Sequence, residues 1–179
     1  MFTCIEMDKF SSRPAKPALK TPNNADPVGI LLSETIDLMG APIDYNRDNE
    51  IYGEGEPTEY IYKVLSGAVR VYKILDDGRR QISGFYLPGG ILRIEVSEEH
   101  RLSAEAIIKS RLLVVKRDSI FALAARQNKI ASDLWSITAR ELDHVQSLMV
   151  TLGRKNAHER VAAFLLEMAR RSNGSLPAV

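Results

Sequence analysis

The chain of 179 residues is 45% hydrophobic and 26% charged, and its 24 Lys and Arg nearly balance 23 Asp and Glu. It is long enough for one sizeable core plus an appendage, and its charge is that of an ordinary globular protein. No apolar run approaches the length of about 18 residues that a membrane helix needs, and residues 1–8 lack the pattern of a secretory signal. We therefore expect a cytoplasmic protein.

The first 27 residues contain four prolines, which leave few consecutive positions for a helix or a strand. We interpret residues 1–27 as a flexible N-terminal tail. Residues 28–39 then carry apolar side chains at helical spacing, and Gly40 is suited to end a helix. A short helix is expected there.

Residues 51–90 combine turn residues with alternating apolar side chains, which indicates a compact roll of short strands. Apolar positions 60–64 and 69–71 flank Ser66-Gly67, so we expect a hairpin there. A second hairpin is expected at Asp77-Gly78, because Gly can adopt the positive φ of a tight turn. The strand over residues 81–87 should end at the Pro-Gly-Gly that follows it.

Three further apolar stretches, residues 91–94, 102–108 and 112–115, predict more strands of the roll. Asp118 is placed to begin a helix, and residues 119–126 predict a short one. Residues 28–128 thus form the expected β-roll with its flanking helices.

From Trp135 onward the apolar residues follow alternating steps of three and four, which predicts a helix over residues 129–153 with a heptad seam. The members of this seam are Trp135, Thr138, Leu142, Val145, Met149 and Leu152. A second stripe beside it comprises Leu134, Ile137 and Leu148. One stripe can pack on the chain's own roll while the other meets the same helix of a second subunit. The alternative is a helix buried entirely within one monomer.

The end of the chain predicts one more helix. Asn156 and Glu159 have the form of a capping box, which would begin a helix over residues 157–171. Five basic residues lie in this part, among them Arg154 and Lys155 just before the capping box. They could approach a DNA backbone, or they could form an ordinary solvated helix face.

Several short motifs follow one another along the roll: EGE at 54–56, VRVYK at 69–73, DDGRRQI at 76–82 and FYLPGG at 85–90. Their order resembles the effector domain of the CRP/FNR family of bacterial transcription regulators. Together with SEEHRLSAEAI at 97–107, they are most similar to the branch that contains FixK, which regulates nitrogen-fixation and low-oxygen respiration genes.

The resemblance implies an α+β fold. Its parts would be a cyclic-nucleotide-binding-type antiparallel β-roll (double-stranded β-helix), a long dimerisation helix over residues 129–153, and the first helix of a truncated winged-helix domain over residues 154–179. We therefore expect a non-enzymatic regulator of low-oxygen or nitrogen-fixation genes, present as its sensor and dimerisation portion without the helix-turn-helix that reads bases. DNA would be a partner only if that missing part were present.

The alternative function is a dimerising or ligand-sensing module that antagonises a full-length relative by forming a heterodimer with it. A cupin-like metal enzyme on a similar roll is a third class, but it would need several His and carboxylate ligands on adjacent strands.

Two positions bear on a ligand. The resemblance implies that cyclic AMP-binding relatives have Arg-Ser-Ala where this chain has Leu102-Ser103-Ala104, so the partner of the cyclic phosphate is missing. Arg101 lies one residue away and should face the other side of a strand. The relatives also have a Gly-Glu at the point where this chain has Arg93 in place of the Gly, and Arg93 is a candidate to bind an anion. The other fate for Arg93 is an ion pair with Glu95 or Glu98.

No cofactor or metal is expected. Cys4 alone cannot hold an iron–sulfur cluster or form an internal disulfide, although an intermolecular disulfide remains open. His100, His144 and His158 lack metal-ligand spacing and are interpreted as solvated, with a haem ligand among them as the alternative. The GEGE sequence at 53–56 should not bind phosphate, because its carboxylates would repel it.

Overall fold

The computed structural model describes residues 29–154 and 156–172, and at residues 148, 151, 152, 154 and 170–172 it describes only the backbone. The predicted tail over residues 1–27 and Cys4 within it lie outside the described residues. None of the described helices is both long and apolar enough to cross a membrane.

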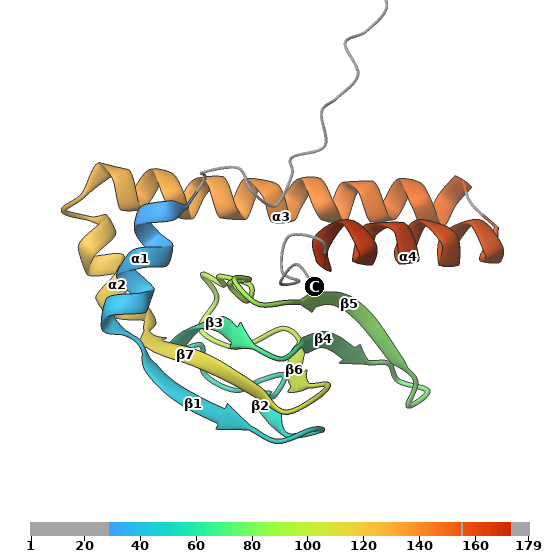
Figure 1. The fold of residues 1–179 in the computed structure, drawn as a ribbon, viewed down its shortest axis with the longest axis horizontal. Coiled ribbons are helices and arrows are strands. Elements are labelled where there is room, and N and C mark those ends of the chain that lie inside the picture. The colour runs from blue at the N-terminus through green and yellow to red at the C-terminus, as the bar shows by residue number, and fades with distance from the viewer. Residues whose placement is uncertain (1–28, 155, 173–179) are drawn as a thin grey trace, which may run out of the picture.

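Two antiparallel sheets form a roll, and helices cover one side of it (Figure 1). The first sheet has the order β1-β7-β3, with β1 (Ala41–Tyr45), β7 (Ser110–Lys116) and β3 (Tyr60–Ser66). The second has the order β2-β6-β4-β5, with β2 (Glu50–Tyr52), β6 (Ser103–Ala106), β4 (Val69–Ile74) and β5 (Arg80–Tyr86). The helices are α1 (Ile30–Met39), α2 (Arg117–Ala124), α3 (Asn128–Arg154) and α4 (Ala157–Ser172).

The turn at Ser66-Gly67 is not a hairpin, and this prediction was wrong. Strand β3 pairs with β7, whereas β4 pairs with β5 and β6 in the other sheet. Gly67 has a φ of 89°, and a Cβ there would lie 2.6 Å from the Cα atom of Ser110. The chain therefore turns a tight corner against β7 and passes from one sheet to the other, a choice that alternation alone does not reveal.

The second hairpin is confirmed. Strands β4 and β5 pair from Val69 with Tyr86 to Ile74 with Arg80, and Gly78 closes the turn with a φ of 79°. The strand expected at residues 91–94 does not form: only Ile91 makes an isolated bridge, to Lys63, while the following Leu92 is buried. Strand β1, which the sequence analysis did not predict, pairs with β7.

Two apolar clusters hold the layers together. One fills the roll and consists of Tyr52, Tyr62, Val64, Val69, Val71, Leu92, Ala104 and Leu112. The other lies between the first sheet and the helices and consists of Leu32, Ile36, Ile61, Leu113, Val115, Ile120 and Ile130. Strand β3 contributes alternate residues to both clusters, so both of its faces are covered.

Helix α1 is anchored at both ends. Gly40 ends it as predicted, with its amide donating to the Ile36 carbonyl at 2.8 Å. At its start, the amide of Leu32 donates to Asp133 Oδ2 on α3 at 3.1 Å. The Asp133 side chain is 3% exposed, so it satisfies an otherwise free helix amide inside the protein. Near the other end, buried Lys63 of β3 pairs with Asp37 at 2.6 Å.

The predicted helix after the roll is confirmed as α2, with Asp118 in its first turn rather than at its cap. In Figure 1, α1 and α2 lie beside the beginning of α3, which then runs along the roll.

Candidate functional site

Helix α3 presents different residues to the roll and to solvent. Leu134 and Ile137 pack against the cluster between sheet and helices, as the second predicted stripe required. Trp135, Leu142 and Met149 face solvent, with exposed fractions of 75%, 57% and 67%. The prediction that the two stripes separate in this way is therefore consistent with the fold.

The other members of the predicted seam are not all exposed to the same extent: Thr138 is exposed, whereas Val145 is half-buried. The side chains of Leu152 in the seam and of Leu148 in the second stripe lie outside the described residues. Trp135, Leu142 and Met149 together form a line of exposed apolar side chains along α3. Contiguous exposed apolar surface is typical of a site where another protein binds.

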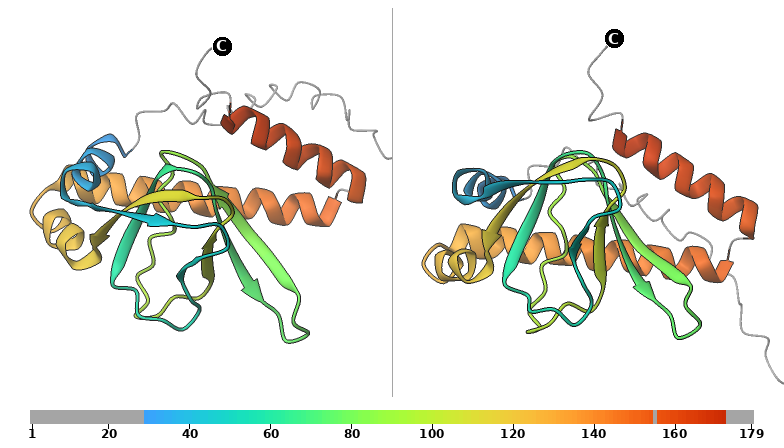
Figure 2. Two further views of the ribbon diagram at one scale, coloured as in Figure 1. Left: turned by 60° about the horizontal axis from the view of Figure 1, so that its bottom comes forward. Right: turned by 90° about the horizontal axis from the view of Figure 1, so that it is seen from below.

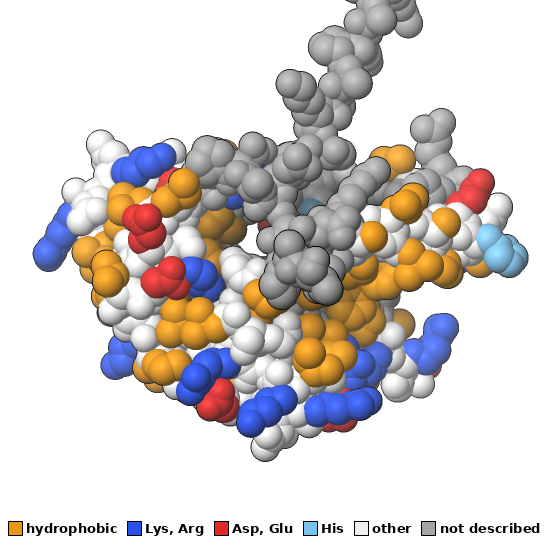
Figure 3. All heavy atoms as spheres, viewed as in Figure 1, with side chains coloured by type: hydrophobic (Ala, Val, Ile, Leu, Met, Phe, Trp, Pro, Cys, Tyr) orange, Lys and Arg blue, Asp and Glu red, His pale blue; other side chains and the backbone are white. Residues whose placement is uncertain are grey.

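Helix α4 turns back from the end of α3 and diverges from it (Figure 2). Its start is the predicted capping box: the Asn156 amide donates to Glu159 Oε2 at 2.9 Å, and the Glu159 amide donates to Asn156 Oδ1 at 3.0 Å. The Phe164 ring meets Phe85 of β5 at a centroid distance of 5.4 Å. Hydrophobic side chains gather along α4 and at its junction with β5 (Figure 3).

The side chain of Arg154 and the whole of Lys155 lie outside the described residues, so their predicted contact with a DNA backbone stays a prediction.

The interior of the roll is occupied by aromatic side chains. Tyr52 and Tyr62 are 4% and 8% exposed, and their ring centroids lie 5.4 Å apart. Burial raises the pKa of both phenols well above the ordinary value, so both are neutral at physiological pH. Leu102, which stands where the family resemblance placed an Arg, packs against this cluster.

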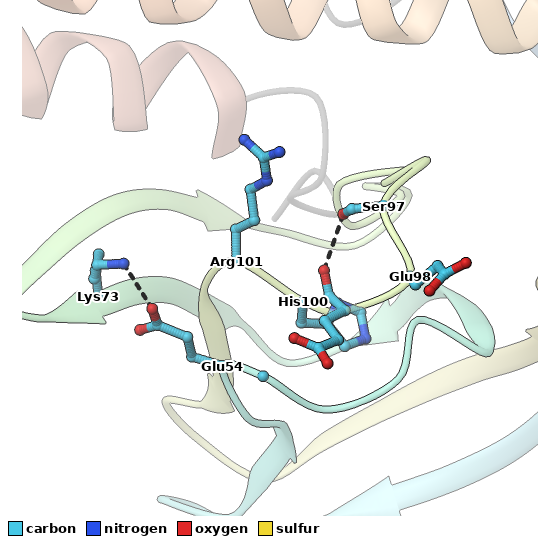
Figure 4. Close-up of a pocket in the computed structure, with 8 residues that line it drawn as sticks. Glu54, Lys73, Ser97, Glu98, His100 and Arg101 are labelled. Carbon is cyan, nitrogen blue, oxygen red and sulfur yellow. Dashed lines mark hydrogen bonds and ion pairs between the residues drawn. The ribbon is translucent and has the colours of Figure 1, made fainter.

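The neighbours of Leu102 do not replace the missing Arg. Ser103 Oγ accepts a hydrogen bond from the Glu54 amide at 2.9 Å. Arg101 is exposed beside a surface depression and extends away from the pair formed by Lys73 and Glu54 (Figure 4). The described interior therefore offers apolar and aromatic surface where an anion would need a cation.

The sequence suggested an ion pair of Arg93 with Glu95 or Glu98, and this alternative was wrong. The Nε atom of Arg93 lies 3.8 Å from Glu141 Oε1 on α3, and its Nη1 atom donates to Ser83 Oγ at 3.4 Å. The loop after β5 directs Arg93 toward α3, a long-range contact that neighbouring residues in the sequence could not indicate.

The interpretation of His100 as a solvated side chain was wrong. His100 is 5% exposed, stacks on Tyr52 at a centroid distance of 3.8 Å, and places Nδ1 2.9 Å from Glu95 Oε2. The charged residues that flank His100 suggested solvent, but Glu95 and the Tyr52 ring supply its partners. His144 and His158 are exposed as expected. Among the described residues, no three His, Cys, Asp or Glu side chains lie close enough to hold a metal ion.

A buried carboxylate on the second sheet was missed by the sequence analysis. Glu105 is 4% exposed and receives hydrogen bonds from Arg70, from Arg80 Nη1 at 3.0 Å, and from Tyr72. Burial alone would raise the pKa of Glu105, but the bonds from Arg70 and Tyr72 and the two Arg charges outweigh it and lower that pKa. An acidic residue at a strand position between two core alanines was the available signal.

Comparison with known proteins agrees with this geometry. Residues 42–127 match the model of the family described as cyclic nucleotide-binding domain. The nitrogen fixation regulation protein FixK of Azorhizobium caulinodans is 43% identical over 140 residues, which are 78% of this chain and 56% of that protein. The FixK of Rhizobium meliloti is 33% identical, over 73% of this chain and 58% of that protein. The chain thus spans somewhat more than half the length of these curated relatives.

Solved structures of related regulators are also similar to this chain. The structure of FixK2 from Bradyrhizobium japonicum superposes with a TM-score of 0.72 at 52% identity, covering 74% of this chain and 67% of that one. The catabolite activator protein of Thermus thermophilus superposes with a TM-score of 0.58 at 25% identity, covering 83% and 70%. The chain therefore belongs to the CRP/FNR family of transcription regulators and is FixK-like.

Proposed function

We propose that this chain is the sensor-type and dimerisation part of a FixK-like transcription regulator, in which α3 pairs with a second copy. The observation that carries the proposal is the line of exposed apolar residues on α3, with Trp135, Leu142 and Met149 at least half exposed. The opposite face of α3 is already used by the chain's own core, so the exposed line is available to a partner.

The roll, in this proposal, is a scaffold that does not bind a cyclic nucleotide. The absence of a cation at Leu102 and the filling of the interior by Tyr52 and Tyr62 support it. A cyclic phosphate buried without a charged partner would carry a large desolvation cost. Isothermal titration calorimetry with cyclic AMP and cyclic GMP should therefore give no binding heat, and a dissociation constant in the micromolar range would contradict the scaffold role.

Dimerisation is tested with a pair of matched variants. Leu142→Asp places a charge in the exposed line on α3, whereas Leu38→Asp places the same charge at an exposed apolar position, 87% accessible, on α1. We expect the first substitution to convert dimers to monomers in sedimentation equilibrium and the second to leave the mass unchanged. Equal effects of the two, or none, would count against α3 as the interface.

Control of nitrogen-fixation or low-oxygen genes, a cytoplasmic location and the lack of enzymatic activity are parts of the same proposal. The names of the two FixK relatives support control of nitrogen-fixation genes. Under this proposal, residues 28–128 act as the roll, residues 129–153 as the dimerisation helix, and residues 154–179 as the beginning of a DNA-binding domain. Arg154 and Lys155 would then lie near a DNA backbone once base-reading helices are present. Without such helices, we expect a gel-shift assay to give only weak, salt-sensitive binding.

A mixed dimer is the second candidate. The exposed line on α3 would also accept the corresponding helix of a longer relative, and such a pair would silence that relative. Co-expression with differently tagged full-length FixK tests this, because a mixed dimer is co-purified through either tag. Recovery of the two homodimers alone would exclude it.

A further inference from the structure

The inner face of α3 carries a second carboxylate besides Asp133, in line with its apolar residues. Glu141 follows Ile137 by one helical turn, and both face the chain's own roll. The Tyr86 hydroxyl donates to Glu141 Oε1 at 3.5 Å, and Arg93 Nε lies 3.8 Å from the same oxygen. Polar groups of the roll therefore meet α3 at this residue.

The roll side of this contact reaches into the interior. Tyr86 is the last residue of β5, and Arg93 lies in the loop that leads to Glu95 and His100. The buried Tyr52 phenol, whose pKa is raised chiefly by burial, also experiences the charges of Glu95, Arg93 and Glu141. Charges of both the roll and α3 thus act on one hydroxyl inside the roll.

Glu141 is also next to a residue of the exposed line. Successive residues of an α-helix are rotated by about 100° about its axis, so contacts on Glu141 constrain the direction of Leu142. The side chains of Arg93 and Glu141 are 29% and 32% exposed, and both contact distances are long. Such a link contributes little energy, so only a small effect of removing it is expected.

We propose that Glu141 is a positioning residue, whose contacts with Arg93 and Tyr86 set the rotation of α3 on the roll and thereby align the exposed line for pairing with a second copy. This inference rests on the proposed dimerisation. In this proposal an internal polar contact, and not a bound ligand, holds α3 in the orientation that it needs to pair with a second copy.

The test is a double-mutant cycle on the full chain, with the dimer dissociation constant measured by sedimentation equilibrium. Glu141→Ala and Arg93→Ala should each raise that constant by roughly two- to five-fold, as expected for a partly exposed pair. The double variant should be no weaker than the weaker single variant, because the two residues act through one contact. Asp143→Asn removes a neighbouring exposed charge on the same helix and should change nothing.

Additive effects in the double variant, or an Asp143→Asn effect equal to that of Glu141→Ala, would overturn the inference. Hydrogen exchange of the α3 amides over residues 137–145, measured at a concentration below the dimer dissociation constant, provides a readout that does not depend on dimerisation. If the parent chain is monomeric, the proposed dimerisation fails. Faster exchange in Glu141→Ala and in Arg93→Ala, but not in Asp143→Asn, would nevertheless support the positioning role. Unchanged exchange in both variants would refute that role.

Discussion

Replacing Glu105 by Gln should destabilise the roll more than any exposed charge change. The Glu105 side chain is buried and pairs with Arg70 and Arg80, whose side chains are 27% and 47% exposed. Breaking a fully buried ion pair costs about 3–5 kcal/mol, and hydrogen bonds to charged groups contribute about 1.5–3 kcal/mol. Because water reaches both Arg side chains, we expect a loss of about 2–3 kcal/mol in the free energy of unfolding, or roughly 4–12 °C in Tm.

The matched control is Glu54→Gln, which breaks an exposed pair with Lys73 and should cost at most about 1 kcal/mol. Urea unfolding at one fixed protein concentration measures both variants. The sign of the pH dependence follows from the lowered pKa of Glu105. Its stabilisation is complete above the ordinary carboxyl pKa of 4.5 and is lost as the pH falls through the folded-state pKa.

The difference between the parent chain and Glu105→Gln should therefore be constant from about pH 6 to 8 and should shrink below about pH 4.5. Equal losses for the two variants, or a difference that grows on acidification, would refute the assignment of Glu105 as the charged centre of this cluster.

Three other substitutions test separate parts of the structure. Asp133→Ala should lower the free energy of unfolding by about 1–3 kcal/mol, because it leaves the buried Leu32 amide without an acceptor, whereas Asp133→Asn should retain most of that stability in urea unfolding. Gly67→Ala forces a left-handed φ and a 2.6 Å approach to β7, so it should reduce Tm well beyond the effect of Gly78→Ala, where the φ is similar but no atom lies within 4 Å. Leu102→Arg should lower Tm without creating a calorimetric signal for cyclic AMP, since two buried tyrosines still fill the interior; tight binding would show that the interior opens.

Local rules predicted the features that depend on a few neighbouring residues. The capping box at Asn156 and the turn at Gly78 formed as expected, because their hydrogen bonds and φ angles involve residues within three or four positions. Helical spacing also placed Leu134 and Ile137 on the inner face of α3 and Trp135, Leu142 and Met149 on the exposed one, whereas Val145 of the predicted seam is half-buried.

Contacts between residues far apart in the sequence were harder to predict. The alternation in β3 and β4 was recognised, but their partners were not, because the tight corner at Gly67 depends on β7 more than forty residues later. The predictions for His100 and Arg93 were wrong for the same reason. Their local neighbours are charged, while the Tyr52 ring that covers His100 and the Glu141 carboxylate next to Arg93 come from distant segments.

The mass of the full chain in solution tests the central claim most directly. Sedimentation equilibrium of the 179-residue chain should give a dimer of about 40 kDa, twice the chain mass of 20.0 kDa, and Leu142→Asp should reduce it to the monomer mass. A monomer mass for the parent chain at every concentration up to about 100 μM, equivalent to a dissociation free energy below roughly 5.5 kcal/mol, would contradict the account of α3 as a dimerisation helix.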